Sequence, residues 1–328
     1  MSLANGKDKF TEQIGDSCLI MKEKNSLLEL WRFLFCMAVL GLHFFAKTDL
    51  NFFHVGYLGV EFFFIVAGYF VGAYYSKHQK DKEFKVRLKS VGNYAVSRLK
   101  RLYPFYLLAL IIILFVRIVL KQYQIREIGS VIKSCFAEFF LLQWTVLGND
   151  VLISAGWFVP AVFFGGIFFV LLFAFTGKIG GFVFAPIISF IIYRYYYLLI
   201  GKIDVIFSYH SVLRGIAGIG FGVFIYFLCN EIKGDSVLQK RENKWISGIG
   251  CMVSSMLFLT IFIYTNYGRR SKLDFLVIFL YGIGVSLLMK SNVKVPKRLA
   301  NIFLTLGKIT YPIYIFQMPV IELIFGSL

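Results

Sequence analysis

Long apolar segments recur along the whole chain of 328 residues. A helix needs about 20 mostly apolar residues to cross the hydrocarbon core of a bilayer. Because lipid offers no hydrogen bonds, a single spanning segment must satisfy its own backbone groups, which only a helix does. We therefore predict an all-α polytopic transmembrane helical bundle. Nine segments meet the length, at 27–46, 56–75, 103–120, 156–176, 180–200, 211–230, 245–264, 274–290 and 306–326.

Composition excludes a soluble domain. Hydrophobic residues make up 58% of the chain and charged residues only 16%, against roughly 45–50% and about 25% in soluble domains. A further apolar piece, Cys135 to Leu147, is too short to span and carries Glu138 and Gln143. We expect it to be a re-entrant or interfacial helix. The cysteines show no CxxC pair and no metal-ligand spacing, so no metal site is expected. No bound cofactor is expected either.

The net charge of +17 is explained by topology. With the N-terminus inside, the inner segments hold 23 of the Lys and Arg residues and the outer loops hold 8. This bias predicts a cytoplasmic N-terminus, with residues 1–26 as a polar cytoplasmic tail and 27–328 as a single transmembrane domain. Membrane lipids are then the expected surroundings of the basic residues, and no nucleic-acid partner is expected.

The first two segments concentrate the ionisable groups. Arg32 and His43 are eleven residues apart, which on a helix places them on one face about 16 Å apart. A hairpin would bring Glu61 of the second segment to a depth similar to that of His43. A histidine and carboxylate pair is suited to taking a proton from a hydroxyl group. The alternative is a pair that only satisfies itself within the bundle.

Two further patterns have both a functional and a structural interpretation. Arg98 and Arg101 lie one helical turn apart in RLKRLYP, which makes a fork suited to phosphate or an ordinary anchor at the inner surface. Trp157 opens the fourth segment as either an interfacial aromatic or a stacking platform for a sugar.

Two more arginines lie within the apolar segments. Arg194 and Arg214 are predicted to be buried cations, partners for an anionic acceptor or for carboxylates. Near Arg214, the glycines of the GxGxG at 218–222 lie inside a span, so helix packing explains them better than dinucleotide binding.

These motifs together resemble the acyltransferase-3 family of integral membrane O-acyltransferases, which modify polysaccharides and other envelope glycans. The resemblance rests on Arg32 and His43 with ten residues between them, on GYLGVEFFFIVAGYF with Glu61 and Gly68, on RLKRLYP, and on TYPIYIFQMPVI. The motifs follow the family's order over nearly the whole chain.

The resemblance implies transfer of an acyl group, commonly acetyl, from cytoplasmic acyl-CoA to a hydroxyl of an envelope glycan or lipid-linked sugar at the plasma membrane. It implies that His43 is the base, that Glu61 orients it and that Arg32 positions the donor. Arg98 and Arg101 would bind the phosphates of CoA.

The chain departs from the family pattern at three points. Ala67 stands where the family usually has serine, and Gln317 stands where a histidine often follows YPIYIF. Tyr311 and Gln317 from this motif are included as candidate substrate contacts. The family usually has about ten spans, so the last helix is expected to be missing.

A secondary transporter is the alternative function. In that case His43, Glu61 and the buried arginines would form a proton relay or a solute site. Transporters often show inverted repeats, and none is visible in this sequence, which favours the enzyme.

Overall fold

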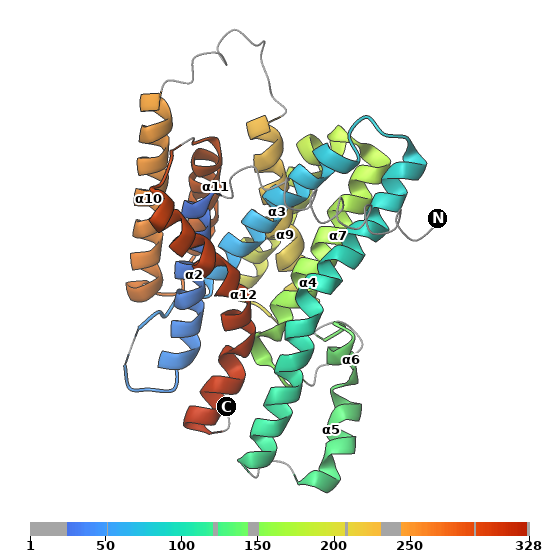
Figure 1. The fold of residues 1–328 in the computed structure, drawn as a ribbon, viewed down its shortest axis with the longest axis vertical. Helices are drawn as coiled ribbons and strands as arrows, with labels where there is room; N and C mark the ends of the chain where they lie inside the picture. Colours follow the sequence, from blue (N-terminus) through green and yellow to red (C-terminus); the bar gives the residue numbers. More distant parts are fainter. Residues whose placement is uncertain are drawn as a thin grey trace, which may run out of the picture.

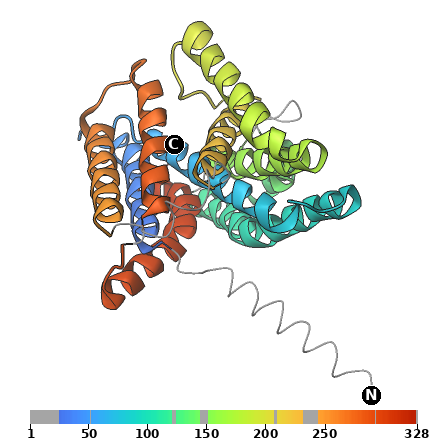
Figure 2. The same cartoon turned by 90° about the horizontal axis from the view of Figure 1, so that it is seen from above.

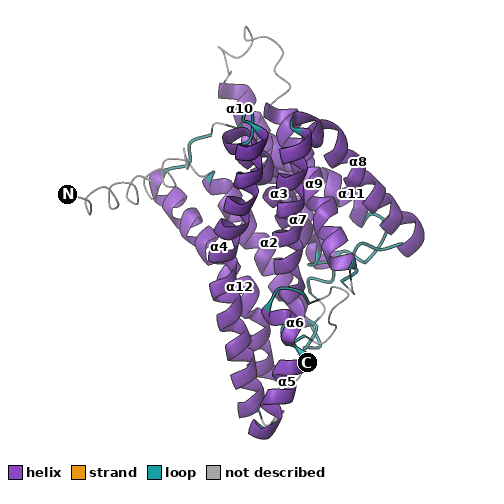
Figure 3. Cartoon of the chain, turned by 90° about the vertical axis from the view of Figure 1, so that its right-hand side faces the viewer, coloured by secondary structure: helices purple, strands orange, loops and turns teal. Residues whose placement is uncertain are grey.

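A computed structural model describes residues 25–50, 52–120, 124–143, 151–206, 209–230, 244–291 and 293–326. Within these ranges the chain is helical and contains no strand (Figure 3). The long helices are α2 (Ser26–Phe45), α3 (Leu58–His78), α4 (Phe84–Val119), α7 (Phe158–Thr176), α8 (Ala185–Tyr195), α9 (His210–Asn230), α10 (Lys244–Tyr267), α11 (Asp274–Lys290) and α12 (Lys297–Phe325). Most of the predicted cytoplasmic tail, residues 1–24, lies outside the described residues.

Each predicted span has a helix in the structure, which confirms the polytopic helical bundle. Eight helical segments are long and apolar enough to cross a membrane. The predicted span at 274–290 is α11, which has 17 residues and is shorter than these eight. The N-terminus-inside orientation stays a prediction.

Two helices extend well beyond the apolar segments that predicted them. α4 begins at Phe84, because the charged stretch before the apolar segment at 103–120 is helical as well. α12 begins at Lys297, directly after Pro296, nine residues before the predicted start of its span. Both extensions carry basic residues, which lower the local hydropathy. A prediction from hydropathy therefore leaves them outside the spans.

α3 and α9 form the centre of the bundle, with α7 and α8 packed on α9 (Figure 1). α12 packs along α2, and α10 packs against α11 on one flank. Seen from above, the α2, α10, α11 and α12 group stands beside the group that holds α4 and α7 (Figure 2). The central α3 therefore contacts helices of both groups.

Glycines set the close contact between α3 and α9. A Cβ on Gly68 would overlap the carbonyl oxygen of Ile219, and a Cβ on Gly222 would overlap that of Ile65. The two helices thus touch backbone to backbone, as small residues allow in membrane bundles. The packing interpretation of the glycines at 218–222 is confirmed.

The short apolar piece at 135–147 does not span. It follows α5 (Ile128–Ser134) and forms the single-turn α6 (Phe136–Phe139) and irregular chain up to Gln143. Its Glu138 is fully buried and accepts hydrogen bonds from the backbone N–H groups of Leu152 and Ile153. The carboxylate thereby fixes the loop that leads into α7, while residues 144–147 lie outside the described residues.

Candidate functional site

A buried ion pair between α3 and α9 lies at the centre of the site. The Nε of Arg214 donates to the Glu61 carboxylate at 2.5 Å, and both side chains are fully buried. The Tyr193 hydroxyl of α8 donates to the other carboxylate oxygen at 3.2 Å. One terminal nitrogen of Arg214 reaches Asp204 at 3.5 Å, and the other donates to the Tyr57 carbonyl at 3.2 Å. Each nitrogen of Arg214 therefore has an acceptor within the protein.

Trp157 lies beside this pair. The Arg214 guanidinium stands 5.0 Å from the centre of the indole ring, which is a cation–π contact. Trp157 is 6% exposed, so it is neither an interfacial aromatic facing headgroups nor open to a sugar in this state. The structure thus brings together two predicted substrate contacts, Trp157 and Arg214. In this structure both side chains contact other residues of the protein.

The ionic network continues from Asp204 to the loop between α10 and α11. Asp204 pairs with Arg270 at 2.7 Å, and the Arg270 guanidinium lies 5.3 Å from the centre of the Tyr57 ring. The Tyr57 hydroxyl in turn donates to Asp274 at the start of α11. These ion-pair, cation–π and hydrogen-bond contacts link the loop before α9 to the start of α3 and to the α10–α11 turn.

His43 lies in the last turn of α2 and is half-buried. Among the described residues it has no hydrogen-bond partner, and the carboxylate whose charge acts on it is that of Asp204. The predicted contact with Glu61 is not formed. The reason lies in the rotation of α3: Gly59 faces α2, where its Cβ would lie 2.6 Å from the Phe35 carbonyl oxygen. Glu61 is two residues further on, about 200° around the helix, and so faces α9.

The opposite end of α2 carries Arg32. It donates to Glu29, one turn earlier, at 2.8 Å. Glu29 is buried against α12, where a Cβ on Gly307 would overlap its carboxylate. This contact fixes the side-chain position of Glu29 and, through it, that of Arg32.

The predicted CoA arginines lie at this same end of the bundle. Arg101 is exposed and lies within electrostatic range of both Arg98 and Arg32, so α2 and α4 contribute to one basic cluster. Tyr311 of α12 is close to Arg101 and donates its hydroxyl to the Leu102 carbonyl at 2.7 Å. The structure therefore brings together four of the residues predicted to bind donor or substrate.

Gln317 is buried in α12 with both amide atoms lacking a hydrogen-bond partner among the described residues. It lies between two points where α12 meets α2. Thr310 accepts a hydrogen bond from the Cys36 thiol, and Phe325 packs its ring on Phe44. Gln317 is thus an unpaired polar group beside the helix that carries Arg32 and His43.

The prediction that Arg194 is a buried cation is wrong. Its side chain lies on the exposed face of α8 and makes no hydrogen bond or ion pair with a described residue, so the expected burial is wrong. An arginine in an apolar segment can reach the membrane surface when it lies near a helix end, and Arg194 is in the last turn of α8.

Asp204, Tyr193 and Arg270 are members of the network that sequence reasoning missed. Asp204 lies in an irregular loop, where hydrophobic periodicity carries no signal. One signal was available, since an acidic residue ten positions before the buried Arg214 is a natural partner for it. Among the described residues, no three His, Cys, Asp or Glu side chains converge as metal ligands.

Comparison with protein-family models identifies the family of this chain. A family model described as an acyltransferase domain, that of the acyltransferase-3 family, matches residues 25–328. Searches of curated proteins and of solved structures gave no match. The family match covers every described helix from α2 to α12. The chain therefore belongs to the acyltransferase-3 family of membrane acyltransferases.

Proposed function

We propose that the protein transfers an acyl group, acetyl in the simplest case, from cytoplasmic acyl-CoA to a hydroxyl of an envelope glycan or lipid-linked sugar at the plasma membrane. The observation that carries the proposal is the placement of charge along α2. Arg32 joins a basic cluster at one end of this helix, and His43 lies three turns away at the other. One helix thus links an anion-binding end to a candidate base.

The basic cluster suits the phosphates of CoA. Arg98 and Arg32 both lie close enough to Arg101 to repel its charge, and Glu29 is the carboxylate that offsets them. A bound phosphate relieves this repulsion, and guanidinium groups bind phosphate in a bidentate geometry. The pantetheine arm would then extend past Arg32 towards His43, along the face where Gln317 offers an unpaired amide.

His43 acts as the general base in the proposed reaction. Its neutral imidazole takes the proton of the acceptor hydroxyl while the hydroxyl oxygen attacks the thioester carbonyl carbon. The tetrahedral intermediate collapses, the carbon–sulfur bond breaks, and the CoA thiolate takes the proton from the imidazolium. The products are the acyl ester and free CoA, and no other reactant is required.

The carboxylate that supports His43 in this proposal is Asp204, and Glu61 acts through it. The charge of Asp204 reaches His43 and stabilises the imidazolium as it forms. Glu61 pairs with Arg214, and both Arg214 and Arg270 pair with Asp204. Through these ion pairs Glu61 fixes the position of Asp204. Glu61 and Arg214 are positioning residues, and the Trp157 ring contacts the Arg214 guanidinium.

The test is transfer of labelled acetyl from acetyl-CoA to envelope glycan in membranes that contain wild-type or variant protein. His43→Ala should abolish transfer, whereas His78→Ala, at the far end of α3, should retain it. Equal transfer by wild type and His43→Ala, with equal insertion of both, would refute the mechanism. CoA-independent movement of a solute without any transfer would instead support a transporter.

A further inference from the structure

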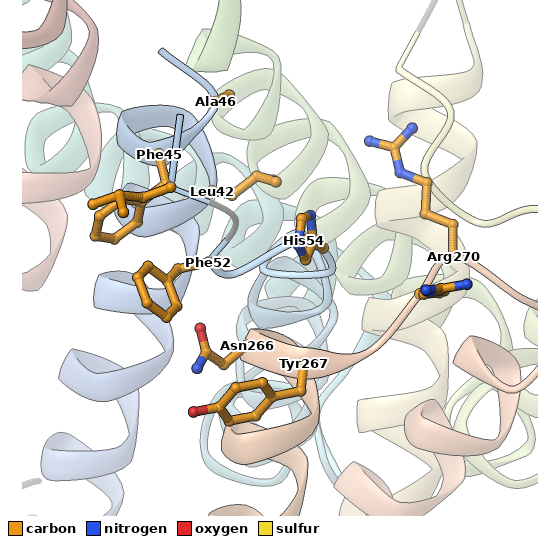
Figure 4. Close-up of a pocket in the computed structure, with 10 residues that line it drawn as sticks. Leu42, Phe45, Ala46, Phe52, His54, Asn266, Tyr267 and Arg270 are labelled. Carbon is orange, nitrogen blue, oxygen red and sulfur yellow. The ribbon is translucent and has the colours of Figure 1, made fainter. Parts of the chain in front are cut away.

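A cavity of about 680 Å³ opens where α2 ends and the α10–α11 turn begins (Figure 4). Apolar side chains from the end of α2 lie on one side, and Arg270 lies on the other. The volume falls within the 300–1,000 Å³ of typical small-molecule sites. The lining residues are Leu42, Phe45, Ala46, Leu50, Phe52, His54, Asn266, Tyr267, Arg269 and Arg270.

The lining is basic and aromatic. Arg269 and Arg270 are both in it, and the described residues that line it include no Asp or Glu. The guanidinium of Arg269 has no hydrogen-bond or ion-pair partner among the described residues, and Arg270 is 54% exposed in spite of its pair with Asp204. Tyr267 and Asn266 add an exposed aromatic ring and an amide. Such a surface attracts an anion and offers hydrogen bonds to hydroxyl groups.

The cavity is connected to the proposed catalytic centre. Leu42 in its wall precedes His43 on α2. Arg270 in its wall pairs with Asp204 at 2.7 Å, and Asp204 acts on the charge of His43. A molecule seated against Arg270 therefore lies at the His43 end of α2, opposite the basic cluster around Arg101.

We propose that this cavity binds the acceptor, and that the acceptor is a saccharide bearing a carboxylate or phosphate group. This inference rests on the proposed acyl transfer and names the substrate class. Arg269 and Arg270 would bind the anionic group, and Tyr267 would pack against a sugar ring. A carboxylate or phosphate group would form charge-assisted hydrogen bonds with these two guanidinium groups that a neutral glycan cannot form, so the site favours an acidic acceptor.

The experiment measures binding to the full-length protein in nanodiscs of phosphatidylcholine, which carry no net lipid charge. The probes are an oligogalacturonate, its methyl ester, glucose 1-phosphate and maltose. We expect oligogalacturonate or glucose 1-phosphate to bind at least about tenfold more tightly than the methyl ester or maltose, since charged hydrogen bonds are lost in the neutral probes. Which of the two acidic probes binds identifies the acceptor's acidic group.

Arg269→Gln should weaken binding of the acidic probe about tenfold and leave maltose binding unchanged. Lys272→Gln is the matched control, because it removes one positive charge from the same loop but lies outside the cavity, with its ammonium over the Tyr197 ring. Equal affinity for acidic and neutral probes, or equal weakening by Lys272→Gln, would overturn the proposal. So would binding of phosphatidylglycerol combined with no binding of any saccharide.

Binding of acetyl-CoA is measured on the same samples and separates the two proposals. We expect Arg269→Gln to retain acetyl-CoA binding, because Arg269 lies at the opposite end of α2 from Arg101. Acetyl-CoA binding by wild type without preference for an acidic saccharide would refute the acceptor class alone. Absence of acetyl-CoA binding by wild type would count against the acyl-transfer function itself.

Discussion

Glu61 and Arg214 form a fully buried ion pair at 2.5 Å that joins α3 to α9. The pair has its remaining hydrogen-bonding groups satisfied by Tyr193, Asp204 and the Tyr57 carbonyl. Two charges taken out of water cost several kcal/mol each unless they are paired in this way. Loss of one partner therefore has a larger effect than loss of the whole pair.

Glu61→Ala and Arg214→Ala are each expected to lower the free energy of unfolding by about 3–5 kcal/mol, because each leaves a buried charge without its partner. The double variant Glu61→Ala/Arg214→Ala should be less destabilised than the sum of the two single variants. Thermal unfolding of the purified protein in detergent measures this.

Arg270→Gln is the control for the stability effects of the Glu61 and Arg214 variants. It breaks the pair with Asp204, in which Arg270 is 54% exposed, and should cost no more than about 1 kcal/mol. Additive effects of the Glu61 and Arg214 substitutions would contradict the coupling.

Gly68→Ala is expected to be strongly destabilising. The added methyl group would overlap the backbone oxygen of Ile219, and backbone cannot rotate away as a side chain can. Gly92→Ala is the control, since nothing lies within 4 Å of a Cβ there. It should be neutral or stabilise α4 by up to about 1 kcal/mol. Comparable losses of folded protein for both variants would contradict the backbone contact between α3 and α9.

The sequence predicted the helices well because each span is determined by its own composition. Segments such as 180–200 and 274–290 coincide with helical segments of the structure, since apolar length alone decides where a chain can cross a bilayer. The depth of a residue along a helix follows in the same way, and the structure has Arg32, Arg98 and Arg101 at one end of the bundle.

The rotation of each helix could not be predicted from spacing. Glu61 was placed beside His43 because the hairpin gives both a similar depth, but tertiary contacts set which way α3 faces. Gly59 lies against α2 and Gly68 against α9, and these contacts turn Glu61 towards Arg214. Asp204 lies in a loop with no repeating pattern, so its spacing from Arg214 is the one sequence signal for it, and the contact with Arg270 depends on the fold.

Arg101→Gln is expected to raise the KM for acetyl-CoA about tenfold and to leave kcat nearly unchanged. The physical reason is the loss of one charged contact to a phosphate far from the reacting carbonyl. Arg98→Gln should behave alike, and Lys85→Gln, near the start of α4, should match wild type.

A donor that lacks the 3′-phosphate provides a second check. If Arg101 binds that phosphate, wild type should lose affinity for 3′-dephospho-acetyl-CoA, and Arg101→Gln should lose little more. A fall in kcat without any change in KM would argue against a donor-binding role.

Gln317→Met is expected to stabilise the protein and slow the transfer. The Gln317 amide is 3% exposed and has no hydrogen-bond partner among the described residues, so replacing it with an apolar side chain of similar size removes a desolvation cost of about 1–3 kcal/mol. If the amide contacts the donor, Gln317→Met should have a lower kcat/KM and a higher melting temperature than wild type.

Gln143→Met is the matched control for stability. The Gln143 side chain is also buried and its oxygen lacks a partner among the described residues, but its amide nitrogen donates to the Tyr106 hydroxyl and to the Gly156 carbonyl, so the same substitution should destabilise. Opposite signs for the two variants are the expected result. Destabilisation by Gln317→Met would show that the amide has a partner in the folded protein.

Stability should depend on pH through Glu138, which lies outside the helices long enough to span. Burial raises the pKa of its carboxyl from 4.5 to about 7, even though the backbone N–H groups of Leu152 and Ile153 and the charge of Arg117 oppose the shift. The folded state therefore holds this proton more tightly than the unfolded state. The resulting stabilisation, at most about 3 kcal/mol, is complete below pH 4.5 and is lost as the pH rises through about 7.

Glu138→Gln isolates this effect, because glutamine keeps a carbonyl oxygen for the two N–H groups but does not titrate. The melting temperature of wild type minus that of Glu138→Gln should fall between pH 5 and pH 8, since other titrating groups cancel in the difference. Parallel melting curves over this range would mean that Glu138 is already ionised at pH 5. The loop into α7 would then be held by a carboxylate whose hydrogen bonds outweigh the cost of its burial.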